Sequence, residues 1–90
     1  MTLKETNEET ATVLAFAALG WVLNDGKRAT RLLSLTGLTP DDLRDRLTEP
    51  ALLAAVLRFL EGHEPDLIGC AEAIGAEPEQ LVEARRRLEE

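Results

Sequence analysis

The sequence predicts an all-α fold, a compact bundle of five or six short helices in one domain that spans residues 1–90. Composition is the first reason. Hydrophobic residues make up 44% of the chain and are mostly Leu and Ala, which favour helices. The β-branched Val and Ile that favour strands are few. The second reason is that helix-starting and helix-ending signals recur along the chain and divide it into short segments.

The third observation is an internal similarity, in which residues 36–47 resemble residues 74–85 at an offset of 38 positions. Self-similarity at a fixed spacing indicates that one supersecondary unit is used twice. We therefore expect a pseudo-repeat of a three-helix unit, in residues 11–47 and 49–85. In each unit a glycine with positive φ should end one helix and a proline should start the next. These structural turn residues are Gly37 and Pro40 in the first unit, and Gly75 and Pro78 in the second.

The first helix is expected from about residue 7 to residue 23. Thr6 and Glu9 have the spacing of a capping box at its start. Gly26 should end it in the left-handed conformation. From residue 11 onward this helix is apolar on every side, which is typical of a helix in the middle of a fold or in an interface.

Two shorter helices should follow. The second spans about residues 27–35, with its cations on the outer side. The third begins with Thr39 as N-cap and Pro40 in the first turn, both of which are favourable at a helix start. Its expected core positions are Leu43 and Leu47.

The second half of the chain repeats this order. Residues 51–60 form a helix that is again apolar all round, and Gly62 ends it. A fifth helix should run from Pro65 to residue 74. The sixth should begin at Glu77-Pro78 and continue to the C-terminus.

The two apolar helices are expected to form the central contact, with Phe16, Leu19, Leu57 and Phe59 buried within the chain. An apolar patch should remain near Trp21. A core position is the default interpretation of this tryptophan, and an interface anchor is the alternative. If the first helix is only partly covered within one chain, Phe16 and Trp21 would anchor a homodimer or a protein partner.

Charge restricts the classes of partner. The net charge is −7, from 17 acidic and 10 basic residues. This argues against binding to nucleic acid or to an anionic membrane, since both need a positive surface. The longest apolar stretch, residues 11–23, is too short to span a bilayer, and the polar N-terminus does not resemble a signal peptide. A cytoplasmic location is expected.

The residues that could carry chemistry do not form a recognisable catalytic set. Cys70 is the only cysteine and is interpreted as a small buried apolar residue. His63 is the only histidine, and no motif supplies it with a nucleophile. The acidic cluster of Asp41, Asp42 and Asp45 is interpreted as capping and dipole complement at a helix start. We therefore expect no enzyme activity, no cofactor, no metal and no evident small-molecule ligand.

A helix-turn-helix protein that binds nucleic acid is the alternative function. Gly75 would be the turn glycine, with Ala71 and Leu81 at the favoured spacing. Both candidate recognition helices begin with acids, however, in Pro-Asp-Asp and Pro-Glu-Gln, and these would repel DNA. The basic run of residues 85–87 lies at the far end of its helix. A non-enzymatic interaction or regulatory module is therefore the preferred interpretation.

One segment carries a family resemblance. Residues 32–44 read Leu-Leu-Ser-Leu-Thr-Gly-Leu-Thr-Pro-Asp-Asp-Leu-Arg, after one apolar helix and before a second that starts at Pro50. The segment Leu-Thr-Gly-Leu-x-Pro-x-Asp-Leu-Arg is its most specific part. The chain resembles a family of small bacterial proteins that is known only as a domain of unknown function. The resemblance implies an all-helical, cytoplasmic, bacterial protein and supplies no catalytic residues.

Overall fold

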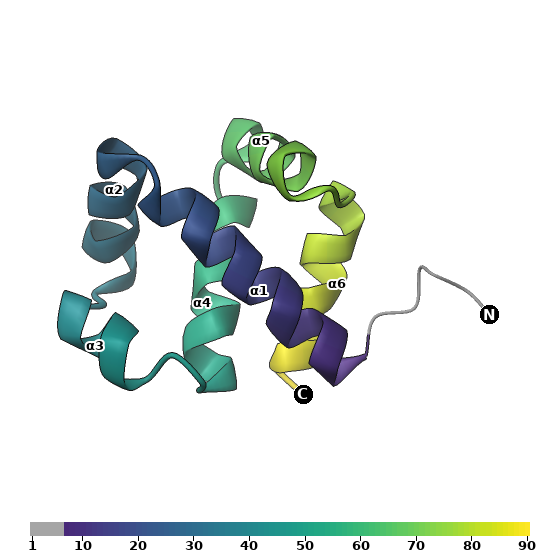
Figure 1. Ribbon diagram of the computed structural model, residues 1–90, viewed down its shortest axis with the longest axis horizontal. Helices are drawn as coiled ribbons and strands as arrows, with labels where there is room; N and C mark the ends of the chain where they lie inside the picture. The colour runs from purple at the N-terminus through teal and green to yellow at the C-terminus, as the bar shows by residue number, and fades with distance from the viewer. Residues whose placement is uncertain (1–6) are drawn as a thin grey trace.

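A computed structural model describes residues 7–90, which form six α-helices and no strand (Figure 1). The all-α bundle predicted from the sequence is confirmed. The helices are α1 (Glu8–Leu23), α2 (Gly26–Thr36), α3 (Pro40–Asp45), α4 (Pro50–Glu61), α5 (Glu64–Ile74) and α6 (Pro78–Leu88).

Helix α1 lies across the middle of the bundle. Figure 1 shows it running diagonally over α4, with α2 and α3 on one side and α5 and α6 on the other. It packs against α2, α4, α5 and α6. A helix with so many neighbours needs apolar residues around most of its circumference, as its sequence has. The central contact involves three helices rather than the expected pair, because α6 packs closely on both α1 and α4.

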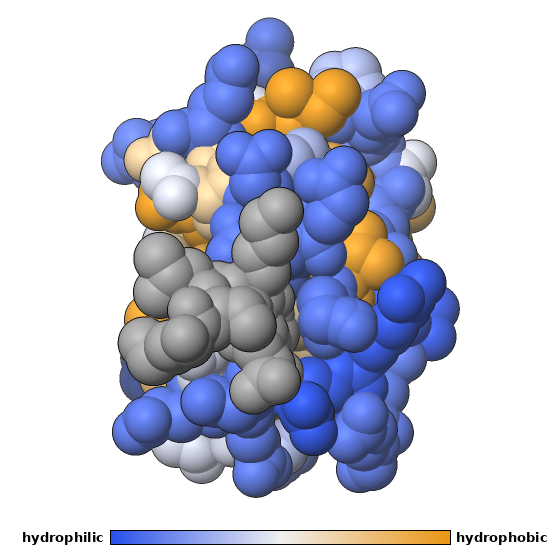
Figure 2. Space-filling model, turned by 90° about the vertical axis from the view of Figure 1, so that its right-hand side faces the viewer, coloured by the Kyte–Doolittle hydropathy of each residue, from blue (hydrophilic) through white to orange (hydrophobic). Residues whose placement is uncertain are grey.

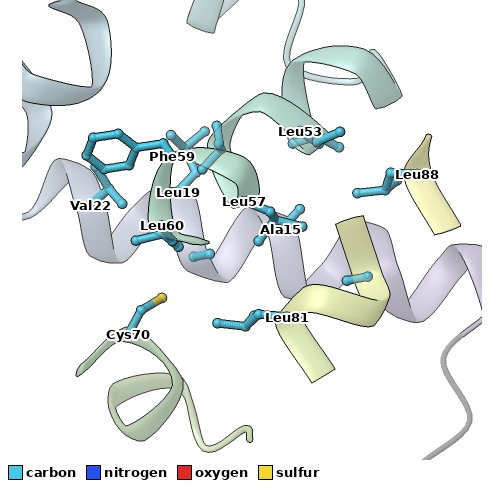
Figure 3. Packing of buried hydrophobic residues seen from close by; sticks show 14 of the residues in the cluster. Ala15, Leu19, Val22, Leu53, Leu57, Phe59, Leu60, Cys70, Leu81 and Leu88 are labelled. Atoms are coloured by element: carbon cyan, nitrogen blue, oxygen red, sulfur yellow. The ribbon is translucent and has the colours of Figure 1, made fainter. Parts of the chain in front are cut away.

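The core is a single cluster of aliphatic side chains, Phe59 and Cys70 (Figure 3). Leu19, Leu57 and Phe59 are buried as expected, but the expectation for Phe16 is wrong, because 38% of this residue is exposed. Helix α1 buries the face that carries Ala15, whose small side chain lets α4 and α6 approach closely. Phe16 follows Ala15 in the chain, so it points about 100° away from that face. The other buried residues of α1 are Ala11, Ala18 and Val22.

The junction between α1 and α2 differs from the expectation. Asn7 caps α1, and its Oδ1 accepts from the Thr10 N–H at 2.8 Å; the expected cap, Thr6, lies outside the described residues. Gly26 does not end α1 in a left-handed conformation but is the first residue of α2. The break is made by Asp25, whose Oδ1 accepts from the Lys27 N–H at 2.9 Å. An aspartate N-cap starts a new helix without needing a positive φ.

The glycines Gly37 and Gly75 adopt the left-handed conformation expected from the sequence, with φ of 77° and 75°. They end their helices by different hydrogen bonds. The Gly37 N–H donates to the Leu33 carbonyl at 3.0 Å, the single bond of an αL cap. After α5, the Ala76 N–H donates to the Ala71 carbonyl at 2.8 Å, which gives the longer Schellman closure.

Helix α3 is the shortest helix and packs least closely on the others. A capping box starts it: Thr39 Oγ1 accepts from the Asp42 N–H and Asp42 Oδ2 accepts from the Thr39 N–H, each at 3.0 Å. Leu43 and Leu47 contact the core but are only partly buried. Local capping, rather than extensive packing, therefore holds much of this segment.

The two proposed repeat units share some of their helix starts and ends. A shift of 38 residues places α2 on α5 at both ends, and places the start of α3 on the start of α6. The same shift leaves α1 starting four residues before α4, and leaves α3 ending five residues before α6. Helix α6 packs on the two central helices, whereas α3 does not pack closely on either. Superposition of the two units stays a prediction.

The side of the molecule that carries α6 is largely polar. Figure 2 looks onto this side and shows mostly hydrophilic residues, with small separate apolar patches. A salt bridge joins two helices here, because Arg85 of α6 donates from Nε to Glu61 Oε2 of α4 at 2.7 Å. At the end of α6 itself, Arg85 also donates from Nη1 to Glu89 Oε1 at 2.9 Å. Ion pairs thus tie the C-terminal end of α6 to α4.

Candidate interaction surface

An apolar groove of about 720 Å³ lies between α1 on one side and α2 and α3 on the other. We call it the α1–α3 groove. Its existence follows from the loose packing of α3, which leaves a gap that no other described helix fills. All of its lining residues except Arg44 are uncharged. The lining residues are Phe16, Leu19, Gly20, Leu23, Leu33, Pro40, Leu43, Arg44 and Leu47.

Helix α1 supplies one wall of the groove and an exposed apolar row beside it. Val13, Phe16, Gly20 and Leu23 follow one another at intervals of three or four residues, so they lie on one face of the helix. We call these four residues the α1 stripe. Val13 is 60% exposed, Phe16 38% and Leu23 43%. Large apolar side chains exposed side by side mark an interaction surface more than the same residues scattered singly would.

Gly20 is the one position of the α1 stripe that has no side chain. It lies inside a helix, where glycine is about 0.5–1 kcal/mol less favourable than alanine. Its φ is not positive, and among residues 7–90 no atom beyond its neighbours and the backbone of its own helix lies within 4 Å of the position that a Cβ would take. Neither backbone conformation nor packing within the chain therefore requires a glycine there. Its absent side chain leaves room for another molecule to approach the helix backbone.

The outer rim of the groove is polar and carries both charges. Arg44 forms an ion pair with Asp41, and both side chains are exposed. The backbone N–H of Thr39 hydrogen-bonds to Asp42 and, as the largest cause, lowers the pKa of that carboxyl. Asp42 therefore complements the start of α3, as expected from the sequence. An apolar floor with a mixed-charge rim is the usual anatomy of a protein-binding surface.

The two residues named from the sequence as possible anchors do not share a surface. Phe16 lines the groove, whereas Trp21 lies five residues later, about 140° around the helix. The Trp21 ring is covered by Arg28, whose guanidinium carbon lies 3.6 Å from the ring centroid. On α5, a Cβ added to Gly69 would lie 3.4 Å from Trp21 Cζ2, so this glycine accommodates the ring. The geometry favours Phe16 over Trp21 as the anchor.

Arg28 also satisfies the end of α1. Its Nη2 donates to the Trp21 carbonyl at 2.6 Å, and its Nη1 lies 3.3 Å from Asp25 Oδ2. A cation at a helix C-terminus is favourable because the carbonyl groups there carry partial negative charge. The tryptophan, the arginine and the aspartate thus form a structural cluster at the α1–α2 junction.

Residues with reactive side chains are placed in structural settings. Cys70 is fully buried, and burial raises the pKa of its thiol to about 11, so it remains protonated at neutral pH. The interpretation of Cys70 as a buried apolar residue is confirmed. His63 Nδ1 lies 3.1 Å from Asp66 Oδ2, and Asp66 is also paired with Arg31. Among the described residues, no group of three potential ligands could hold a metal ion.

A second hollow of about 470 Å³ lies between α2 and α4. Three of its lining side chains are basic, but each has an acidic neighbour: Arg31 and His63 pair with Asp66, and Arg58 pairs with Glu89. The charge available to an outside anion is therefore small. This hollow is a weaker candidate than the α1–α3 groove.

The basic run at the end of α6 is also engaged in ion pairs. Hydrogen bonds to Glu61 first, and to Glu89 second, raise the pKa of Arg85. Arg86 lies 3.8 Å from a Glu83 carboxylate oxygen, and Arg87 lies 3.4 Å from one of Glu90. These arginines are in the last turn of the helix, as the sequence analysis expects, and acids neutralise them locally. Such an arrangement gives no support to a phosphate-binding surface.

The sequence did not predict that most groove residues form an interaction surface. Of its lining residues only Phe16 was predicted to lie in an interface, whereas Pro40 was predicted in a turn, and Leu19, Leu43 and Leu47 in the core. Gly20, Leu23 and Leu33 were missed because α1 is apolar on every side, so its pattern does not reveal which face is left uncovered. The intervals within the α1 stripe were a usable signal, since positions 13 and 20, and 16 and 23, are each seven apart.

Comparison with known proteins identifies a family. Residues 8–90 match the family described as "Protein of unknown function (DUF3572)", and the chain therefore belongs to it. Neither the curated proteins nor the solved structures contain a match to the chain. The helices between residues 7 and 90 include none long and apolar enough to cross a membrane.

Proposed function

We propose that this member of a family of unknown function is a non-enzymatic protein-interaction module, which binds an apolar helix of a protein in the α1–α3 groove. The observation that carries the proposal is the coincidence of three features on one face. These are an apolar groove, a row of exposed large side chains along its wall, and an unfilled position at Gly20.

The dimensions of the groove suit a helix. The groove-lining residues of α1 run from Phe16 to Leu23, about 10 Å along the helix axis, and the α1 stripe continues beyond the groove to Val13, about 15 Å in all. A partner helix of about three turns would cover that length. Its apolar residues at positions i, i+3, i+4 and i+7 would enter the groove, as in other helix-in-groove complexes. Leu43 and Leu47 on the opposite wall would contact the other flank of such a helix.

Several observations favour binding over catalysis. The only cysteine is buried and protonated at neutral pH, and the only histidine is exposed and close to a carboxylate that an arginine also contacts. No nucleophile with an adjacent base is found among the described residues. The net charge of −7 and the paired arginines of α6 favour a protein partner over nucleic acid, and a cytoplasmic location is part of the proposal.

The proposal is tested with a fluorescently labelled synthetic amphipathic helix. The peptide carries Leu at i, i+3, i+4 and i+7, with equal numbers of Lys and Glu on the other face so that net charge does not drive binding. Fluorescence anisotropy at low protein concentration should give a saturable affinity in the micromolar range. No saturation up to about 1 mM, a free energy of only about −4 kcal/mol, would contradict the proposal.

A matched pair of variants identifies the surface. Leu23→Gln removes a 43%-exposed leucine from the groove wall, and Leu35→Gln removes a 72%-exposed leucine outside it. Burial of a leucine side chain contributes about 1.5–3 kcal/mol, so loss of about half of that weakens binding roughly tenfold. We expect this loss for Leu23→Gln alone. Equal affinities of the two variants, with unchanged circular dichroism, would place the binding site elsewhere.

A further inference from the structure

We infer that the occupant of the α1–α3 groove is the α1 helix of a second copy of this chain, packed antiparallel so that Phe16 of each copy lies over Gly20 of the other. This inference rests on the proposed function and specifies its partner. It follows from the order of side chains along the α1 stripe, from the absence of charge on that stripe, and from the apolar walls of the groove, which extend the contact beyond the stripe.

The spacing of the α1 stripe is that of a helix–helix seam. Val13 and Gly20 are seven residues apart, and so are Phe16 and Leu23. A seven-residue repeat with two positions per repeat keeps one face of a helix in register with a partner helix. No residue of this seam is charged, and the seam faces away from the buried side of α1.

The seam is complementary to itself when it is reversed. Phe16 and Gly20 lie two positions on either side of residue 18, and Val13 and Leu23 lie five positions on either side. A twofold axis opposite residue 18 therefore pairs Phe16 with Gly20 of the second copy, and Val13 with Leu23. The bulkiest residue of the stripe then faces the one without a side chain. A twofold interface requires this kind of self-complementary patch.

The walls of the groove extend the contact. A stable interface usually buries about 800 Å² on each partner, more than four side chains of one helix can supply. With α1 paired to α1, the second copy's helix also lies close to the opposite wall of the groove, where Leu33 and Leu43 are partly exposed. Helix α3 packs loosely and can adjust to this contact.

Charge distinguishes this occupant from a foreign partner. Each copy carries a net charge of −7, so two copies repel one another at long range, and the neutral stripe adds no attraction between charges. Salt screens this repulsion over a Debye length of about 10 Å at 0.1 M. Added salt should therefore strengthen self-association. Added salt would instead weaken the binding of a basic foreign helix, because it screens the attraction between opposite charges.

The experiment is sedimentation velocity of the full chain from about 1 µM to about 1 mM. Wild type should pass from monomer to dimer within this range, and at lower concentration when salt is added. Phe16→Ala removes the large residue, and Gly20→Leu fills the space that it enters. Each single substitution should weaken the dimer at least roughly tenfold. Far-UV circular dichroism verifies that the variants remain folded.

The double variant tests the register. In Phe16→Ala/Gly20→Leu, the leucine of each copy faces the alanine of the other, so association should recover relative to both single variants. A double variant as weak as the single ones would overturn the register. A wild type that stays monomeric up to about 1 mM would overturn the homodimer, and the labelled apolar helix would then decide the proposed function separately. If that helix binds, the proposed interaction function holds with a partner other than a second copy. If it does not bind, both the homodimer and the proposed function are contradicted.

Discussion

Alanine substitution at two glycines should change stability in opposite directions, although the space around both is the same. At Gly20 and at Gly75 a new Cβ would lie more than 4 Å from every described atom other than those of its local backbone and adjacent residues. Contacts with the rest of the protein therefore play no part in the comparison. The backbone conformation decides the result, because Gly75 has a φ of 75° and Gly20 does not have a positive φ.

The magnitudes follow from the two conformations. Gly20→Ala replaces glycine inside a helix and should stabilise the monomer by about 0.5–1 kcal/mol. Gly75→Ala forces a Cβ into the left-handed region and should destabilise by about 1–2 kcal/mol. In a domain of this size, 1 kcal/mol shifts Tm by about 4–8 °C. The two variants should therefore differ in Tm by at least roughly 6 °C.

The assay is urea unfolding followed by circular dichroism, at a protein concentration low enough to keep the chain monomeric. The midpoint should rise for Gly20→Ala and fall for Gly75→Ala, with the slope of free energy against urea unchanged. At high concentration the advantage of Gly20→Ala should shrink, because dimerisation stabilises the wild type more than the variant. A loss of stability for Gly20→Ala in the monomer would refute the conclusion that the chain leaves this position open.

Four further outcomes are expected. Leu57→Ala, at a fully buried position, should lower the free energy of unfolding by about 2–5 kcal/mol in urea titrations, whereas Leu35→Ala on the surface should change it by less than about 0.5 kcal/mol. Asp42→Asn should destabilise at neutral pH: the pKa of Asp42 is lowered from its ordinary value of 3.8, so its contribution is present above that pH and is lost as pH falls through the folded value. The difference in free energy of unfolding between wild type and Asp42→Asn should thus vanish in acid. A difference that persists in acid would contradict the assignment to the charge of Asp42. Amide hydrogens of α3 should exchange before those of α1 and α4, and slow exchange in α3 would contradict its loose packing. Duplex DNA of random sequence should show no salt-sensitive, sub-micromolar anisotropy change at physiological salt, and such binding would revive the helix-turn-helix alternative.

The number and order of the helices could be predicted because their boundaries depend on short-range chemistry. Thr39 and Asp42 reach each other's backbone within one turn, and Pro40 has no N–H to lose in the first turn of α3. Where two local signals competed, the prediction was wrong. At the α1–α2 junction, Asp25 and Gly26 both fit a helix break, and the aspartate makes it.

The candidate site could be predicted only in part. Phe16 was identified as a possible interface residue from the excess of apolar residues on α1, but the same pattern led to the expectation that it is buried. Hydrophobicity is shared by core and interface residues, so a helix that is apolar all round does not show which side stays uncovered. For Trp21 the possible role as an interface anchor is not favoured, because Arg28 covers its ring and Gly69 accommodates it. Both contacts come from other helices, and no local sequence pattern predicts them.

The sequence by itself determined the helical class, the left-handed turns at Gly37 and Gly75, and the burial of Leu57 and Cys70, because these depend on local propensity and on side-chain hydrophobicity. The tertiary structure alone decided that α6, and not α3, fills the space beside α1 and α4. It thereby decided which face of α1 remains open. The physical reason is that a groove arises where two surfaces fail to meet, and this depends on how all the helices pack together rather than on the residues of any one of them.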